Sequence, residues 1–283
     1  MASSPGFAYY PSLEGKTTLI TGASSGIGEI AAQHFAFCGS NLILMARRKD
    51  RLDALAALIR EKYPACKLVH VATVDVRHPA EIEAALQNLP AELRDIDILI
   101  NNAGLAKGVN PTYQNTLEDI DVVIDTNVKG MLYVIRSFAP GMKARGSGTI
   151  INISSIAGIE AYKNGSIYCA SKHAVHALTI ALRKELASTP IRVCMVSPGL
   201  VNTEFSTVRF DDKEKADAVY SDIVPLSGRD VADNLVYIAS RPPHVQIADL
   251  LVLPTCQGST EVVHRGPLIG STSALEYLER GDF

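Results

Sequence analysis

The sequence shows no excess of positive charge, no long apolar run and no paired-cysteine motif, and each absence excludes a class of protein. Its 283 residues contain 27 Lys and Arg against 30 Asp and Glu, a net charge of −3, which excludes a strongly basic nucleic-acid binder. No apolar stretch reaches the ~20 residues of a membrane helix, so we expect no membrane partner. With 47% hydrophobic and 20% charged residues, the composition excludes disorder and indicates a globular protein with a substantial core.

The cysteines, at positions 38, 66, 169, 194 and 256, are odd in number, and no C-x-x-C motif occurs. Neither a disulfide framework nor a zinc site is therefore predicted, and we expect no bound metal. His173 and His176 stand at i and i+3 but have no partnering Cys or carboxylate motif. The first charged residue is Glu14, and no basic region precedes an apolar core, so the expected location is cytoplasmic.

Short apolar runs alternate with longer amphipathic runs along the chain. The predicted strands are rich in Ile, Val and Leu and comprise 17–20, 41–45, 67–73, 96–100, 149–153, 191–196 and 250–253. The predicted helices include 26–37, 50–62, 79–89, 117–143 and 166–187. Strands that are buried on both faces and alternate with helices indicate an α/β fold. We expect a single-domain, Rossmann-type, doubly wound parallel sheet of about seven strands with helices on both faces.

No Gly-, Ser- or Pro-rich linker divides the sequence, so one Rossmann-type domain is expected at residues 16–266. An N-terminal arm (1–15) and a C-terminal tail (267–283) flank this domain. The segment 202–225 interrupts the alternation with mixed charges and is interpreted as a helical excursion or lid between the last two strands. Since no residues are left for a substrate domain, the pocket must come from loops of the same sheet.

A glycine-rich turn follows the first predicted strand, with its glycines in the order G-x-x-x-G-x-G. Glycines let the backbone approach a pyrophosphate, and the next helix N-terminus offers free N–H groups and partial positive charge. The alternative is a glycine-rich turn that binds no ligand. Because the turn lies directly between the first strand and the first helix, we predict a dinucleotide-binding turn. Its predicted contacts are Gly22, Ser24, Ser25, Gly26, Ile27 and Gly28.

The end of the second predicted strand distinguishes between the two nicotinamide dinucleotides. An NAD site places an acidic residue there, whereas this sequence has Arg47 and Arg48. An arginine pair suits a 2′-phosphate and favours NADP; the alternative is that both arginines begin a solvated helix face. Asp75 and the adjoining Val76, after the third strand, are predicted at the adenine, although Asp75 is also suited to capping a turn.

Tyr168 and Lys172 stand at i and i+4 of a predicted helix and therefore share one of its faces. A phenol with a pKa of about 10 is a poor base at neutral pH, and a nearby ammonium group lowers that pKa. The pair indicates a general acid/base for an alcohol or a carbonyl. Ser155 ends the strand before this helix, where its hydroxyl can donate to a substrate oxygen. The alternatives are a surface pair for the tyrosine and lysine, and strand-end capping for the serine.

These elements occur in one order and at one set of spacings. They are Thr21-Gly-x-x-x-Gly-x-Gly28, Asn101-Asn-Ala-Gly104, Asn127, Ser155, Tyr168-x-x-x-Lys172 and Pro198-Gly199. The combination resembles the short-chain dehydrogenase/reductase family over about residues 16–266. The resemblance implies an NADP-dependent oxidoreductase acting on CH–OH groups, in which a hydride passes between nicotinamide and a carbinol carbon.

The resemblance also implies a role for each matched residue. Tyr168 would exchange the proton, Lys172 would lower its pKa and hold the nicotinamide ribose, and Ser155 would polarise the substrate carbonyl. Asn127 would order a water that connects Lys172 to solvent. The other implied cofactor contacts are Asn102, Ala103 and Gly104 beside the adenosine, and Pro198, Gly199, Val201 and Thr203 beside the nicotinamide.

A narrower likeness is to the NADP-dependent 3-hydroxy acid dehydrogenases of fungi and bacteria. It is carried by residues 165–172, 182–186, 198–210, 247–254 and 264–266. It implies a homotetramer and a short 3-hydroxy acid or related small carbonyl compound as substrate. Arg209 is the candidate for the substrate carboxylate, with a surface pairing to Asp211 or Asp212 as the alternative. A carbonyl reductase of a specialised pathway and a non-catalytic NADP-sensing protein are the competing hypotheses.

Overall fold

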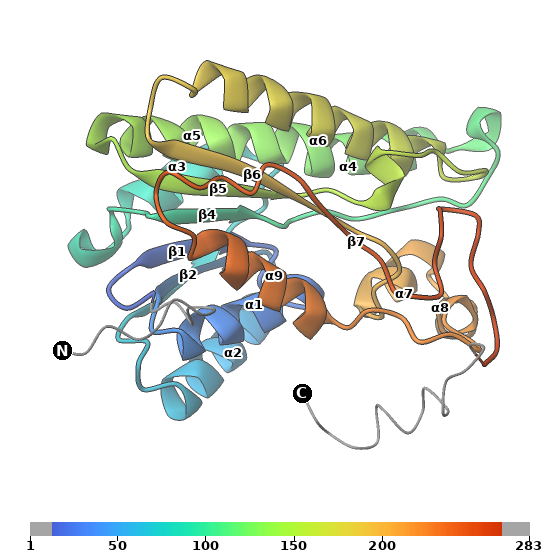
Figure 1. The fold of residues 1–283 in the computed structure, drawn as a ribbon, viewed down its shortest axis with the longest axis horizontal. Helices are drawn as coiled ribbons and strands as arrows, with labels where there is room; N and C mark the ends of the chain where they lie inside the picture. The colour runs from blue at the N-terminus through green and yellow to red at the C-terminus, as the bar shows by residue number, and fades with distance from the viewer. Residues whose placement is uncertain (1–12, 268–283) are drawn as a thin grey trace.

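The computed structural model describes residues 13–267, whose strands form one seven-stranded parallel sheet (Figure 1). The sheet order is β3-β2-β1-β4-β5-β6-β7. The strands are β1 (Thr17–Thr21), β2 (Asn41–Ala46), β3 (Val69–Thr73), β4 (Ile98–Asn101), β5 (Gly148–Ile153), β6 (Ile191–Pro198) and β7 (Leu250–Val252). The predicted α/β doubly wound fold is confirmed. The predicted arm and tail lie almost wholly outside the described residues, and the domain boundaries stay a prediction.

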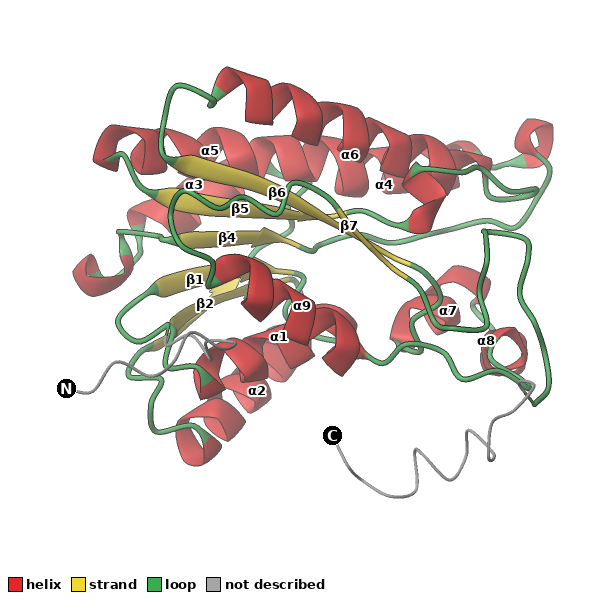
Figure 2. Cartoon of the chain, viewed as in Figure 1, coloured by secondary structure: helices red, strands yellow, loops and turns green. Residues whose placement is uncertain are grey.

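Helices cover both faces of the sheet, with α1, α2 and α9 on one face and α3, α5 and α6 on the other (Figures 1 and 2). They are α1 (Gly26–Phe37), α2 (Lys49–Lys62), α3 (Pro79–Gln87), α4 (Leu117–Ile124), α5 (Met131–Arg145), α6 (Ser166–Glu185), α7 (Glu204–Phe210), α8 (Lys213–Val219) and α9 (Gly228–Ala239). α7 and α8 lie beyond the carboxyl ends of the strands (Figure 1). Within residues 13–267, no helix combines the length and apolar character that crossing a membrane requires.

Both faces of the sheet are packed, which explains the nearly continuous apolar runs of the strands. Successive side chains of a strand point to opposite faces. Leu19 therefore joins the core cluster that includes residues of α3 and α5, whereas Ile20 joins the cluster that includes residues of α1, α2 and α9. Ile150 and Ile151 of β5 divide in the same way, and all four side chains are fully buried. Parallel strands need this double burial, so their sequences show no alternation of polar and apolar residues.

The predicted helix at 117–143 is interrupted in the structure. α4 ends at Ile124, a π-helical turn spans Asp125–Gly130, and α5 begins at Met131. The buried Asn127 side chain lies on this wide turn and bonds the backbone of Leu105. A π-helical turn is often found at functional sites, where it redirects side chains without ending the helix.

Segment 202–225 contains α7 and α8, which confirms the expected helical excursion between β6 and β7. α9, which follows it, was not predicted from the sequence. This helix begins with a capping box: Ser227 Oγ accepts from the Asp230 N–H, and the Asp230 carboxylate accepts from the Ser227 N–H at 2.6 Å. The reciprocal pair satisfies two of the free N–H groups at the helix start and fixes where α9 begins.

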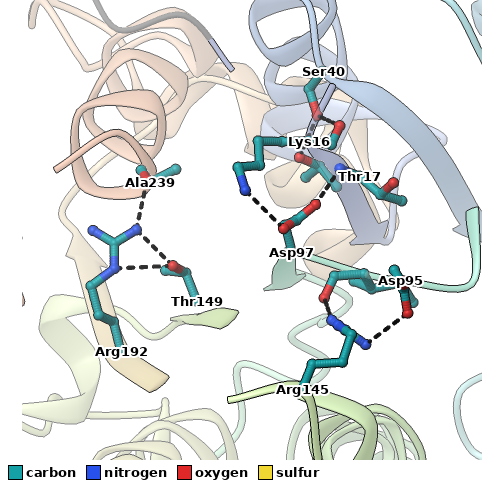
Figure 3. Close-up of polar contacts among 11 residues, drawn as sticks. Lys16, Thr17, Ser40, Asp95, Asp97, Arg145, Thr149, Arg192 and Ala239 are labelled. Atoms are coloured by element: carbon teal, nitrogen blue, oxygen red, sulfur yellow. Dashed lines mark hydrogen bonds and ion pairs between the residues drawn. The ribbon is translucent and has the colours of Figure 1, made fainter. Parts of the chain in front are cut away.

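Polar contacts fix the amino ends of the strands (Figure 3). Asp97, just before β4, accepts from the Thr17 N–H at 2.9 Å and from Lys16 Nζ at 3.1 Å, which joins it to the start of β1. Arg145, at the end of α5, pairs with Asp95 at 3.4 Å. These contacts leave the opposite edge of the sheet, at the carboxyl ends of the strands, to form the site.

Arg192 on β6 ties the C-terminus of α9 to β5. Its guanidinium group donates to Thr149 Oγ1 at 2.7 Å and to the Ala239 carbonyl at 2.6 Å (Figure 3). It also donates to the Ile238 carbonyl at 3.1 Å. We expect Arg192→Leu to lower the free energy of unfolding by about 2–4 kcal/mol, because helix-end carbonyls lose a charged donor. Urea denaturation measures the change. Arg136→Leu, at a side chain that is 74% exposed, is the control. Arg136→Leu should lower the free energy of unfolding by less than ~0.5 kcal/mol. Equal decreases in the two variants would contradict the role of Arg192 in capping α9.

Candidate functional site

A cavity of about 450 Å³ opens at the carboxyl ends of the strands. It reaches from the turn after β1 to α7 and to the segment after β7. The strand order reverses between β1 and β4, and open α/β sheets bind ligands at such a switch point. The predicted residues that line the cavity are Gly22, Ser24, Ser25, Gly26, Ile27, Arg47, Arg48, Asp75, Val76, Asn102, Ala103, Gly104, Ser155, Tyr168, Lys172, Pro198, Gly199, Val201, Thr203 and Arg209. Gly28 and Asn127 lie behind this lining.

The turn after β1 has the shape of a phosphate cradle. Gly22 adopts a left-handed φ of 67°, and a Cβ there would lie 2.9 Å from Ala103 Cα. A Cβ on Gly28 would lie 2.4 Å from the Gly22 carbonyl oxygen, so this glycine serves the close packing of α1 on the turn. α1 begins at Gly26, and Ser25 at its N-cap makes no side-chain capping bond. The first N–H groups of α1 therefore suit a pyrophosphate.

The segment after β4 closes the other side of this cradle. Thr21 Oγ1 accepts from the N–H groups of Asn102 and Ala103, both at 3.0 Å. The Asn102 side-chain amide donates in turn to the carbonyls of Thr21 and Gly22 at 3.0 and 3.3 Å. Asn102 therefore holds the glycine-rich turn in shape, in addition to its predicted contact with adenosine.

Arg48 lies across the glycine-rich turn. Its Nη2 donates to Ser25 Oγ at 2.6 Å, and its Nε donates to Ser24 Oγ at 3.2 Å. Arg47 is exposed at the same end of the cavity. Two guanidinium groups beside two serine hydroxyls and a helix N-terminus fit a 2′-phosphate group.

Two of the predicted site residues, Asp75 and Asn127, form hydrogen bonds with other residues of this chain. Asp75 accepts from the Arg77 N–H at 3.0 Å and from its guanidinium at 2.6 Å, so it caps the turn after β3 as well as lining the cavity. Asn127 Oδ1 accepts from the Leu105 N–H and its Nδ2 donates to the Leu105 carbonyl, both at 2.8 Å. Its Nδ2 also donates to Ser171 Oγ at 3.0 Å. These contacts position the segment after β4, and the implied ordering of a water by Asn127 stays a prediction.

Ser155, Tyr168 and Lys172 come together in the cavity. Ser155 follows β5, where its Oγ accepts from the Ala157 N–H at 3.1 Å and is hydrogen-bonded to the Tyr168 hydroxyl. Tyr168 and Lys172 lie one turn apart on α6, with Lys172 Nζ 5.7 Å from the Tyr168 ring centroid. Lys172 Nζ donates to the Ile153 carbonyl at 2.9 Å. The three side chains can therefore act on one substrate oxygen as hydrogen-bond donor, proton donor and nearby positive charge.

Burial governs the protonation of Tyr168 and Lys172. It raises the pKa of Tyr168 above its ordinary value, which the hydrogen bond with Ser155 opposes only in part. It lowers the pKa of Lys172 to about 8. The expected lowering of the Tyr168 pKa by the ammonium group is therefore not the prevailing effect, because the pair is enclosed away from water. At neutral pH Tyr168 is a protonated phenol, which is the form that donates to a carbonyl oxygen.

Arg209 lines the cavity from α7. Its Nη1 donates to the Tyr162 hydroxyl at 2.9 Å, and its guanidinium carbon lies 5.3 Å from the Tyr162 ring centroid. The alternative surface pairing with a neighbouring aspartate is not observed among the described residues, and Asp212 pairs with Lys215 at 3.3 Å. Arg209 Nε and Thr260 Oγ1 are buried and lack a hydrogen-bond partner within residues 13–267. Both residues line the cavity, so both atoms are available to a polar ligand.

Much of the cavity lining around α7 was not predicted. α7, α8 and the segment after β7 contribute side chains for which the sequence predicted no role. These are Phe205, Val208, Phe210, Val219, Tyr220, Gln257 and Thr260. Phe205 packs against Tyr168, with ring centroids 5.5 Å apart. The sequence indicated part of this lining in one way only: the predicted helical excursion, residues 202–225, lies between the last two strands.

Known proteins resemble this chain at the levels of family, sequence and structure. A family model described as short chain dehydrogenase matches residues 16–214. The chain is 44% identical over 255 residues to the NADP-dependent 3-hydroxy acid dehydrogenase of Schizosaccharomyces pombe, which covers 89% of this chain and 98% of that protein. It is 40% identical over 241 residues to sulfoacetaldehyde reductase 2 of Chromohalobacter salexigens, with 84% and 94% covered. The closed form of serine dehydrogenase complexed with NADP+ matches with a TM-score of 0.82 at 40% identity, over 88% of this chain and 99% of that one.

Proposed function

This chain belongs to the short-chain dehydrogenase family, and from that membership we propose that it is an NADP-dependent oxidoreductase acting on CH–OH groups. Its substrate is a short 3-hydroxy acid or a related small carbonyl compound. The observation that carries the proposal is a single cavity that contains the Ser155, Tyr168 and Lys172 cluster together with Arg48 and Arg209. One end has the charges for a 2′-phosphate, and the other has an acid/base and a cation for a small anion.

The residues of the cavity fit NADP from end to end. When bound, NADP supplies or accepts the hydride at its nicotinamide ring. The N–H groups at the start of α1 would hold the pyrophosphate, and Arg47 and Arg48 would hold the 2′-phosphate. Asp75 and Asn102 would lie at the adenosine. The nicotinamide end would be held by Lys172 and by the chain after β6, at Pro198, Gly199, Val201 and Thr203.

Three side chains handle the substrate oxygen. During reduction Ser155 donates a hydrogen bond to the carbonyl oxygen, and Tyr168 delivers its proton to that oxygen; during oxidation the proton returns. Lys172, with a pKa of about 8, is largely protonated at neutral pH and is held beside the phenol by the Ile153 carbonyl. Its positive charge stabilises the phenolate that Tyr168 becomes after proton transfer.

Arg209 supports the choice of an anionic substrate. Tyr162 occupies one nitrogen of its guanidinium group and orients it, while the buried Nε has no protein partner among the described residues. A carboxylate accepting from Nε would satisfy this donor, and Thr260 Oγ1 would add a second hydrogen bond. The 3-hydroxy acids and sulfoacetaldehyde after which two relatives are named are small anions.

Arg209→Gln tests this substrate assignment. We expect kcat/KM for 3-hydroxypropionate to fall by about 10- to 100-fold, the value of a lost charge-assisted hydrogen bond. For an uncharged aldehyde of similar length, kcat/KM should change by less than about threefold. Tyr162→Phe, which removes the partner hydroxyl but keeps the cation, should lose less than Arg209→Gln. An equal loss for the charged and uncharged substrates would show that Arg209 does not bind the carboxylate.

The carbonyl-reductase alternative is supported by the apolar part of the lining, at Phe205, Val208 and Phe210. Comparison of kcat/KM for L-serine, 3-hydroxyisobutyrate and bulky ketones decides between the two substrate classes. Preference for the two acids supports the proposal, whereas preference for the ketones supports a reductase of a specialised pathway.

We further propose a cytoplasmic homotetramer. Tyr113 and Leu117, four residues apart in the sequence near the start of α4, are 85% and 80% exposed, which supports contact with another copy. Five unpaired thiols within the described residues support a reducing compartment. Light scattering of the purified chain tests the assembly.

A further inference from the structure

Glu204 stands where the two ends of the cavity meet. It begins α7, and its Oε1 and Oε2 both lie 2.7 Å from Arg51 Nη1. Its Oε2 also lies 3.4 Å from Nη1 of Arg48, whose Nη2 and Nε bond Ser25 and Ser24. The Glu204 carboxylate is thus ion-paired with the Arg48 guanidinium group, which is also the group that would bind the 2′-phosphate.

The residues on either side of Glu204 contact the catalytic and phosphate ends. Phe205 packs against the Tyr168 ring, with 5.5 Å between centroids. Thr203 caps α7 through its side chain, and its Cβ lies 3.4 Å from where a Cβ on Gly26 would stand. The start of α7 therefore touches the glycine-rich turn, the arginines and the catalytic tyrosine within three consecutive residues.

The charges at this junction make Glu204 and a phosphate competitors. Hydrogen bonding by Arg51, followed by the charges of Arg51 and Arg48, holds the pKa of Glu204 below its usual value, so the carboxylate is ionised at neutral pH. Glu29 lies near enough that its pKa is raised, first by burial and then by the Glu204 charge. Two anions repel each other across one guanidinium group, so a phosphate arriving at Arg48 weakens the hold of that group on Glu204.

We propose that Glu204 is a specificity-determining residue that couples the phosphate end of the cavity to the substrate end. The 2′-phosphate and Glu204 compete for Arg48, so occupation of the phosphate site loosens the start of α7, the helix that carries Phe205 and Arg209. This inference rests on the proposed position of the 2′-phosphate. If this coupling exists, the start of α7 is held less tightly when NADP is bound than when NAD is bound. Linkage between two sites requires such a difference.

Glu204→Gln tests the competition, because glutamine keeps the shape and removes the charge. The probes are adenosine 2′,5′-bisphosphate and 5′-AMP, which lack nicotinamide, and calorimetry gives their dissociation constants. We expect the variant to bind the bisphosphate about two- to fivefold more tightly, the size typical of a half-exposed ion pair, with 5′-AMP nearly unchanged. Glu214→Gln, at an exposed position of α8, removes the same charge and should change neither constant. Unchanged or weaker bisphosphate binding by Glu204→Gln would overturn the proposal.

Two further measurements distinguish competition for Arg48 from a general electrostatic effect of the Glu204 charge. In an Arg48→Ala background, Glu204→Gln should no longer tighten bisphosphate binding; persistence of the effect would overturn competition for Arg48. Hydrogen exchange of the α7 amides should rise in the wild-type chain when bisphosphate is added. In Glu204→Gln it should already be high and should not rise further. Exchange that falls or stays constant in the wild type would overturn the loosening of α7.

The outcomes also distinguish this inference from the proposed function. A wild-type chain that binds the bisphosphate no more tightly than 5′-AMP would refute both the 2′-phosphate position and the coupling. A wild-type chain that prefers the bisphosphate, with no effect from Glu204→Gln, would refute the coupling alone.

Discussion

Tyr168→Phe is expected to lower kcat/KM for NADPH-dependent reduction by about 10²- to 10⁴-fold, the usual contribution of general acid catalysis. The hydroxyl is bonded to Ser155 and is protonated at neutral pH because burial raises its pKa. Phenylalanine fills the same space against Phe205, so the loss reports the missing proton rather than lost packing. The dissociation constant of NADPH should change by less than about threefold, because the hydroxyl acts on the substrate oxygen.

Loss of NADPH absorbance with small aldehydes, ketones and semialdehydes measures the turnover of this variant, and a fluorescence titration measures its NADPH binding. Tyr162→Phe is the matched control, since it removes another hydroxyl from the same cavity and should keep turnover of uncharged substrates. Turnover of Tyr168→Phe at the wild-type rate would contradict the mechanism. A wild-type chain that binds NADPH but reduces no carbonyl compound would favour the sensor hypothesis.

Arg47→Asp is expected to weaken NADPH binding by about 10²-fold, because the change removes a charge-assisted hydrogen bond and adds a like charge beside the 2′-phosphate. NADH, which lacks this phosphate, should lose less than about threefold. Arg47 suits the test better than Arg48, because Arg48 also bonds both serines of the glycine-rich turn.

Lys62→Asp is the control for the change in net charge. Lys62 is exposed at the far end of the 14-residue helix α2, about 20 Å away along the helix axis. It should leave both dissociation constants unchanged, and raised salt should weaken NADPH binding more than NADH binding in the wild type. If Arg47→Asp weakens NADPH and NADH equally, the 2′-phosphate does not lie at this arginine.

Local patterns were sufficient to predict the sheet and many of the residues that line the cavity around the glycine-rich turn. Strands buried on both faces carry continuous apolar runs that are visible in the sequence. The glycine-rich turn was recognisable because its geometry needs glycine: Gly22 has a φ of 67°, and a side chain on Gly28 would meet the Gly22 carbonyl. The i and i+4 spacing placed Tyr168 and Lys172 on one face of α6 for an equally local reason.

The proposed substrate end depends on contacts between distant segments. The sequence marked Arg209 as a candidate there, but no pattern placed Thr260 beside it. Tyr162 follows β5, Arg209 belongs to α7, and Thr260 follows β7, yet all three line one cavity. The π-helical turn at Asn127 was missed because one widened turn hardly alters an amphipathic pattern. The direction of the Tyr168 pKa shift was missed because the sequence shows its lysine neighbour but not the depth of burial.

The hydrogen bonds between Asn102 and the turn after β1 join two segments that lie far apart in the sequence. The amide that completes the cradle lies 81 residues beyond Thr21, and β4 must insert beside β1 before the two can meet. A nascent chain that has released only β1, β2 and β3 therefore has an open strand edge and no formed cradle. The pairing of β4 with β1 is a non-local contact, and such contacts tend to form slowly because a long loop must close first. Once β4 is in place, a dinucleotide that binds the completed cradle but not the unfolded chain stabilises the native state by mass action.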